Sequence, residues 1–161
     1  MSFRPIAAAI AGVAGTVVMT AAMRRLNRHL PVEARYPLPP RELVEVGGPG
    51  LPEPVAEEVT LLGHACYGAA TGAIMPVLIR QASIFNGALY GGLVWVLSYL
   101  GWIPASGLLK TAARHPPSRN LAMIAAHLVW GGVTALAYRE LTRSEEEIFA
   151  GRLTPDQDEE Y

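Results

Sequence analysis

The 161-residue chain contains a single cysteine, Cys66, so an internal disulfide and a zinc ribbon are both excluded. Its 13 basic and 14 acidic residues nearly cancel, and the chain lacks the basic excess that is typical of proteins that bind nucleic acid. Charged residues make up only 17% of the chain, whereas apolar residues make up 51%. The places where charge is missing therefore carry the most information about this protein.

Charged residues are absent from four long windows, at positions 5–23, 59–79, 81–109 and 120–138. A helix that crosses a bilayer needs about 20 apolar residues. A soluble helix of the same length would carry charged residues on its outer face. The sequence therefore predicts an all-α integral membrane protein with four transmembrane helices. We expect these helices near residues 5–23, 56–79, 84–103 and 120–139.

The predicted transmembrane domain covers residues 1–142 and includes a long proline-rich loop at 24–55. Because proline is so frequent in this loop, we expect extended backbone rather than a folded subdomain. The tail at 143–161 is acidic, and we expect it to be partly disordered. Near its beginning, Ser144 is followed by three glutamates in a capping-box pattern that could start a short helix.

The loops predict an orientation. Loops 24–55 and 104–119 would share one side of the membrane and carry eight basic residues, against five on the other side. The positive-inside rule then places both loops in the cytoplasm and both termini outside. We expect a multi-pass protein of a bacterial inner membrane whose surroundings are the lipid bilayer, and we expect no nucleic-acid partner.

Glycine recurs at intervals of four residues inside the windows, in the pairs Gly68/Gly72 and Gly87/Gly91. Gly131 lies in the last window. Between membrane helices, small residues allow the backbones to approach closely, which supplies the packing that hydrophobicity cannot. These positions therefore predict tight helix packing within the monomer, or a seam for a homo-oligomer or another membrane protein.

The chain contains one nine-residue pattern twice, at 64–72 and 127–135: His, two residues, an aromatic residue, Gly, two residues, Thr and a small residue. The two copies lie on predicted helices that run in the same direction, which indicates a possible parallel two-helix repeat. Their candidate ligand-binding residues are His64, Tyr67, Thr71, His127, Trp130 and Thr134.

The two histidines allow three interpretations. Ionisable residues within a membrane are candidates for function, and we consider a pocket for a small molecule, a haem or a proton at His64 and His127. The structural alternative is that each ring bonds to a neighbouring helix. No nucleophile elbow, P-loop or metalloprotease motif occurs, which favours a non-enzymatic protein. An interfacial lipid enzyme using Glu57, Glu58, Arg119 and the histidines is a further alternative. We predict no protein-bound metal, and haem is the only cofactor considered.

Two motifs resemble a known family. The segment Tyr36-Pro-Leu-Pro-Pro-Arg41 and the closing Ala126-His127-Leu-Val-Trp130, with Tyr138-Arg-Glu-Leu141, are similar to the YagU-like family of bacterial inner-membrane proteins. The resemblance implies a polytopic inner-membrane protein of structural or accessory type, with a role in envelope or acid-stress homeostasis. That role is our leading hypothesis from the sequence, and the histidine site is its alternative.

Overall fold

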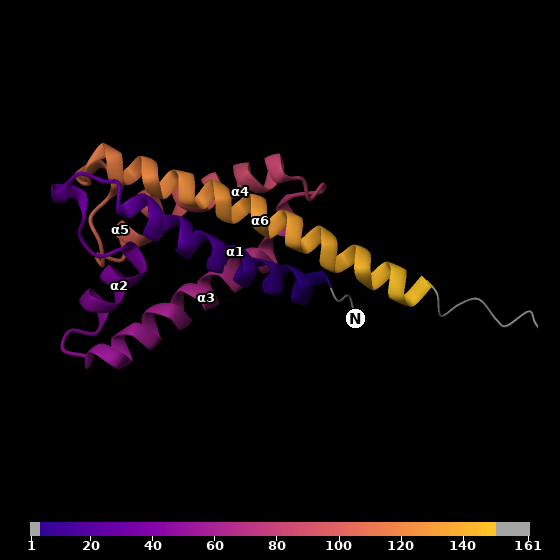
Figure 1. Cartoon of the computed structure of the whole chain (residues 1–161), viewed down its shortest axis with the longest axis horizontal. Coiled ribbons are helices and arrows are strands. Elements are labelled where there is room, and N and C mark those ends of the chain that lie inside the picture. The colour runs from indigo at the N-terminus through magenta and orange to yellow at the C-terminus, as the bar shows by residue number, and fades with distance from the viewer. Residues whose placement is uncertain (1–3, 151–161) are drawn as a thin grey trace, which may run out of the picture.

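A computed structural model of the chain describes residues 4–150 (Figure 1). This part is helical, and no strand occurs in it. The four long helices are α1 (Arg4–Asn27), α3 (Glu53–Leu78), α4 (Ile84–Val96) and α6 (Pro117–Ala150). The shorter elements are η1 (Val32–Ala34), α2 (Pro39–Gly47), the π-helical turn η2 (Leu97–Trp102), α5 (Ile103–Ala105) and η3 (Ala112–Arg114).

Four helical stretches within residues 4–150 are long and apolar enough to cross a membrane, as the charge-free windows predict. They are Arg4–Asn27, Glu53–Leu78, Ile84–Ala105 and Pro117–Glu145. The third combines α4, η2 and α5, and its backbone leaves the helical region at Gly101, with φ −111° and ψ −109°. Pro104 follows at the beginning of α5, where a missing N–H is tolerated.

Helices α1 and α3 form one helical hairpin, and α4 and α6 form a second. The two hairpins pack together through α1 and α6, the inner helices, while α3 and α4 are the outer helices. Helices α1 and α6 pack against each other, α3 packs against the other side of α1, and α4 packs against the other side of α6. In Figure 1, α3 diverges from α6 toward the end of the molecule where α2 and α5 lie. Helix α2 lies beside α3 at this end.

Glycines make the contact within each hairpin. A Cβ atom on Gly68 would lie 1.9 Å from Thr16 Oγ1, and one on Gly72 would lie 2.6 Å from the Ala8 carbonyl oxygen. In the other hairpin, a Cβ atom on Gly91 would lie 2.0 Å from the His127 carbonyl oxygen. Any larger residue at these positions would force the helices apart, so each of these glycines serves packing within one chain.

The expectation of extended backbone throughout loop 24–55 is wrong, because α2 forms within it. Pro39 and Pro40 occupy the first positions of α2, where the missing N–H groups would have no helical partner in any case. Arg41 on α2 pairs with Glu45 one turn later and with Glu53 at the beginning of α3, at 2.8 Å each. This part of the loop is thus a folded helix rather than an extended linker.

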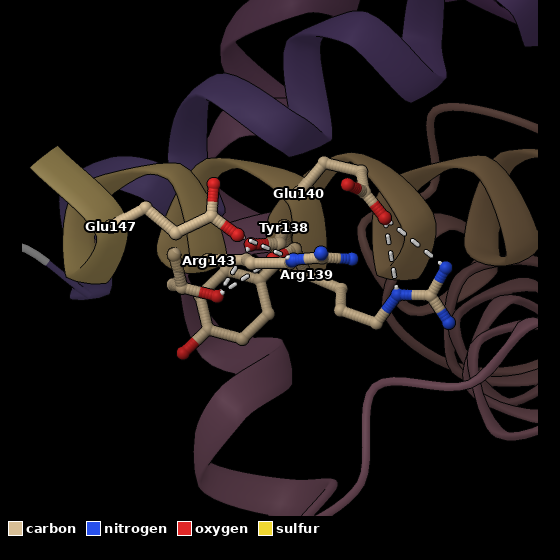
Figure 2. A network of polar contacts seen from close by, with 6 residues as sticks. Tyr138, Arg139, Glu140, Arg143 and Glu147 are labelled. Atoms are coloured by element: carbon tan, nitrogen blue, oxygen red, sulfur yellow. Dashed lines mark hydrogen bonds and ion pairs between the residues drawn. The ribbon is translucent and has the colours of Figure 1, made fainter.

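The acidic segment after Arg143 does not start a new helix. Instead, α6 continues unbroken to Ala150, and Figure 1 shows its last turns extending past the neighbouring helices. Figure 2 shows the polar contacts of this extension, where Arg143 Nε lies 2.9 Å from Glu147 Oε1. Ser144 cannot act as a cap because its own backbone is already helical. The predicted disorder of the tail falls at 151–161, outside the described residues.

Candidate ligand-binding cavity

His64 of α3 and His127 of α6 line one cavity of about 310 Å³. The cavity is lined by residues of α1, α2, α3, η2, α5 and α6, at the end of the molecule that carries α2 and α5. Its lining is largely apolar, with Met19 and Met23 of α1 contributing side chains from the inner pair of helices. The two copies of the nine-residue pattern thus contribute their first residue to the same site, although neither histidine is near the other in sequence.

The hydrogen bonds of His64 determine which ring nitrogen carries its proton. The Thr20 hydroxyl donates to the Thr16 carbonyl oxygen at 2.8 Å, so its oxygen is left to accept. His64 Nδ1 lies 3.3 Å from that oxygen and must be the donor. A neutral imidazole has only one N–H, so His64 Nε2 is an acceptor.

His127 has the same arrangement with a different partner. Its Nδ1 lies 2.8 Å from the carbonyl oxygen of Met123, and a carbonyl can only accept. The neutral ring therefore donates from Nδ1, and Nε2 is again the acceptor. Among residues 4–150, neither Nε2 atom has a protein hydrogen-bond donor. The cavity is consequently lined by two imidazoles that can each accept a hydrogen bond from a guest molecule.

Tyr67, Ser98 and Tyr99 also line the cavity, and one of these three side chains has no hydrogen-bond partner within the described residues. The Ser98 hydroxyl donates to the Val94 carbonyl oxygen, so Tyr67 OH donates to Ser98 Oγ at 2.8 Å. Tyr99 also lines the cavity and is only 6% exposed, yet its hydroxyl has no hydrogen-bond partner within the described part of the chain. A buried hydroxyl without a partner is costly. The ring of Tyr99 lies edge-on to that of His127, with the ring centres 6.3 Å apart.

Helix α2 covers the cavity. Pro39, Pro40, Leu43 and Val44 all line it. Helix α2, which we call the cover of the cavity, belongs to the loop that joins α1 to α3. Access to the cavity from this end therefore depends on the contacts that fix this loop to the long helices.

The loop is held by Arg119, at the beginning of α6. This side chain is only 2% exposed, and its guanidinium donates to the carbonyl oxygens of Tyr36 at 3.1 Å and Pro37 at 2.6 Å. A third contact reaches Glu42 of α2 at 3.4 Å. The guanidinium carbon also lies 3.7 Å from the centre of the Tyr36 ring. Arg119 thus connects α6 directly to the segment that begins α2.

Tyr36 extends this connection to the other loop. His115 Nε2 donates to the Lys110 carbonyl oxygen at 3.2 Å, which leaves His115 Nδ1 to accept from the Tyr36 hydroxyl. Burial raises the pKa of Tyr36, although the charge of Arg119 acts in the opposite direction. The hydroxyl therefore keeps the proton that it donates to His115. Two loops and the beginning of α6 are joined at this point.

The structure separates the remaining candidate residues from the cavity. Trp130 Nε1 donates to the Gly12 carbonyl oxygen and to Thr16 Oγ1, both at 3.2 Å, in the contact between α1 and α6. Thr134 is fully buried in the same contact. The Thr71 hydroxyl donates to its own helix, at the Tyr67 carbonyl oxygen. Of the six candidate residues, His64, Tyr67 and His127 line the cavity. Thr71, Trp130 and Thr134 do not.

The residues proposed for an interfacial lipid enzyme are not brought together. Glu57 and Glu58 are exposed and do not line the cavity, while Arg119 is occupied by the loop. Tyr99, Ser98 and the α2 residues were not predicted as site residues. Proline after proline at 39–40 signals a helix beginning, but no sequence pattern indicates that this helix would lie over the histidines.

Comparison with known proteins adds no relative: no family model, curated protein or solved structure matches this chain. The resemblance to the YagU-like family therefore stays a prediction.

Proposed function

We propose that this chain is a multi-pass protein of a bacterial inner membrane that binds a small, largely apolar molecule carrying a hydroxyl or N–H group. The observation that carries the proposal is the cavity shared by His64 and His127. Both rings are oriented by a bond from Nδ1, and both offer Nε2 as an acceptor. A guest with an apolar body and one polar end fits this lining.

The size and chemistry of the cavity support a small guest. Ligand pockets in proteins span about 300–1,000 Å³ and are mostly apolar, with a few polar groups that orient the ligand. At about 310 Å³, this cavity lies at the lower end of that range. The guest hydroxyl can donate to Nε2 of His64 or His127 while the rest of the guest contacts the apolar lining. A phenol or a short alcohol meets both requirements.

A haem held by both histidines is the alternative ligand for the same site. Histidines that bind a metal commonly donate their second N–H to a carbonyl or a hydroxyl, as His64 and His127 do. Within residues 4–150, however, no group of three or more His, Cys, Asp or Glu side chains is placed to hold a metal ion by itself. An absorption band in the visible range from purified protein would favour haem over a small organic guest.

A structural or accessory role is the second candidate function, and it includes the envelope or acid-stress role that the family resemblance implies. It is favoured by the fact that each histidine already has one local hydrogen bond. The glycine contacts between helices serve packing alone and need no ligand. In this case the cavity would be a packing defect with no preferred guest.

Internal duplication is part of the proposal, because it explains why two histidines reach one site. Gly68 of α3 lies against Gly12 of α1, and Gly131 of α6 lies against both Gly87 and Gly91 of α4. In the nine-residue pattern, Gly68 and Gly131 hold the same position. The same position of the pattern thus lies at the helix contact in both α3 and α6, which supports the proposed repeat.

The test compares two probes of the same shape, p-cresol and p-xylene, which differ by a hydroxyl in place of a methyl group. Binding to the protein in nanodiscs is measured by equilibrium dialysis, with empty nanodiscs subtracted. A hydroxyl loses hydration on burial whereas a methyl group does not, so the informative quantity is the ratio of the p-cresol affinity to the p-xylene affinity. We expect this ratio to fall about tenfold in the double variant His64→Ala with His127→Ala, the factor given by ~1.4 kcal/mol from one hydrogen bond to a buried acceptor.

The matched control is His29→Ala, which removes a loop histidine whose Nδ1 bonds to the Arg25 carbonyl oxygen away from the cavity. It should keep the wild-type ratio of the two affinities. An unchanged ratio in the double variant would contradict the proposed site, and the structural role would then stand.

A further inference from the structure

Arg80 is the only charged residue between Glu58 and Lys110. It lies in the short connection between α3 and α4, at the end of the molecule opposite α2, and it is exposed. The ion pairs found within residues 4–150 all involve other arginines. A single positive charge is therefore held at the boundary of two long apolar helices without an acidic partner in the described part of the chain.

Arg80 stands at the polar end of a groove of about 550 Å³. Gln81 and Asn86 line this end beside it, and the Asn86 amide donates to the Gln81 carbonyl oxygen at 3.0 Å. Leu89 and Leu93, one turn apart on α4, continue the groove along the helix. They are 58% and 44% exposed, so they present an apolar wall that no other part of the described chain covers.

The groove exists because α3 and α4 pack on different partners. Helix α3 is held by α1 and α4 is held by α6, so the two outer helices are connected mainly by side chains across the space between them. Tyr90 closes the bottom of the groove, since it is only 5% exposed and its hydroxyl donates to the Thr71 carbonyl oxygen at 2.6 Å. The groove is thus distinct from the histidine cavity, with which it shares no lining residue.

We propose that this groove binds a phospholipid, with the phosphate at Arg80 and one acyl chain along Leu89 and Leu93. Arginine forms strong, charge-assisted hydrogen bonds with phosphate. Basic pockets between membrane helices bind the head groups of anionic lipids. The amide groups of Gln81 and Asn86 can donate to the same head group. A free phosphate would use only the polar end and would leave the apolar wall uncovered.

The dimensions agree with an acyl chain. From Asn86 to Leu93, α4 rises by roughly 10 Å at 1.5 Å per residue. One leaflet of the hydrocarbon core is about 15 Å thick, half of the whole. A chain that begins at the level of Arg80 therefore runs along the leucines for most of one leaflet. This proposal does not depend on the histidine cavity.

The experiment measures lipid retention by native mass spectrometry of the full chain. Protein in detergent is mixed with equal amounts of phosphatidylglycerol and of a diacylglycerol with the same acyl chains, which lacks the phosphate. We expect phosphatidylglycerol to be retained about fivefold more than diacylglycerol, the factor that one basic residue contributes at an anionic lipid surface. Arg80→Gln should abolish this preference, and because Arg80 is exposed the variant should keep the melting temperature of the wild type.

Arg139→Gln is the matched control. It removes a charge from an exposed arginine near the same end of the molecule, outside the groove, where Arg139 pairs with Glu140. This variant should retain phosphatidylglycerol like the wild type. So should the double variant His64→Ala with His127→Ala, and failure of the cavity proposal is therefore distinguishable from failure of this one.

Three results would overturn the proposal. The first is unchanged phosphatidylglycerol retention in Arg80→Gln, and the second is equal retention of the two lipids by the wild type. The third is displacement of phosphatidylglycerol by an equal concentration of inorganic phosphate, which would show that the groove binds a free anion rather than a lipid.

Discussion

Gly12 of α1 and Gly68 of α3 cross with backbone against backbone: a Cβ atom on Gly12 would lie 2.1 Å from the Gly68 carbonyl oxygen. The contact joins the two helices of the first hairpin at their midpoints. It also places His64, one turn before Gly68, toward α1 and Thr20. The close approach of the two backbones therefore contributes to the position of the cavity wall.

The first prediction concerns these glycines. Gly91→Ala should lower the free energy of unfolding by about 1–3 kcal/mol, because the new methyl group would overlap the His127 carbonyl oxygen and the helices must separate. Gly63→Ala is the control, since a Cβ atom at Gly63 meets no atom within 4 Å. Unfolding in detergent, followed by circular dichroism, measures both. Equal stability of the two variants would mean that α4 and α6 do not pack as described.

The second prediction concerns the protonation of the two histidines. Nitrogen-15 NMR should show His64 and His127 as neutral rings protonated at Nδ1, the form required by their hydrogen bonds. Thr20→Val removes the acceptor for His64, so the proton of that ring should move to Nε2 while His127 stays unchanged. Thr71→Val, which changes a threonine bonded to its own helix, should alter neither ring. Protonation of both rings at Nε2 in the wild type would refute the assignment.

The third prediction concerns Arg119. Arg119→Gln should cost roughly 1.5–3 kcal/mol of stability, because charged hydrogen bonds to the Tyr36 and Pro37 carbonyl oxygens are lost. Hydrogen exchange at α2 should rise in the same variant, as the cover of the cavity is released. Arg41→Gln removes a half-buried arginine of α2 whose ion-pair partners, Glu45 and Glu53, are exposed, and it should raise the exchange rates less than Arg119→Gln does. Slow exchange of α2 in Arg119→Gln would show that another contact holds the cover.

The fourth prediction concerns the tail. Truncation after Leu153 should leave expression and the melting temperature in detergent unchanged, because half of the removed residues are acidic and the segment offers little apolar surface to bury. Thermal unfolding of the truncated and the full chain provides the comparison. A lower melting temperature would indicate that the tail contacts the folded part.

The fifth prediction concerns topology. After replacement of Cys66 by alanine, single cysteines introduced at Ser2 and Ser144 should both react with a membrane-impermeant maleimide in intact cells. Both sites would then face outside, as the excess of basic residues on the other side predicts. Reaction at only one site would exclude an even number of membrane crossings, and protection of both would reverse the orientation.

The long helices could be predicted because their signal is local. Each charge-free window meets the length requirement for a membrane helix regardless of what surrounds it, and each of the four overlaps one long apolar helical stretch. The ends of the helices were less predictable. Helix α6 extends to Ala150 because charged residues on an exposed helix are no obstacle, and the i, i+4 pair Arg143–Glu147 supports it.

The proline-rich loop shows the limit of reasoning from composition. Frequent proline indicates extended backbone on average, but Pro39 and Pro40 lie at the one place where proline favours a helix. Whether a helix then forms depends on whether its apolar side can pack against other parts of the protein. Leu43 and Val44 line the cavity, which forms only when α1, α3 and α6 have assembled.

By itself, the sequence determined the four apolar helices, the glycines that allow close packing and the equivalence of His64 and His127, since all of these follow from residue types and spacing along one chain. Only the tertiary structure decided that the two histidines share a cavity while Trp130 and Thr134 pack elsewhere, and that Arg119 holds the cover. The physical reason is that these contacts join residues far apart in sequence, so they depend on where the helices cross and on which side of each helix then faces a neighbour.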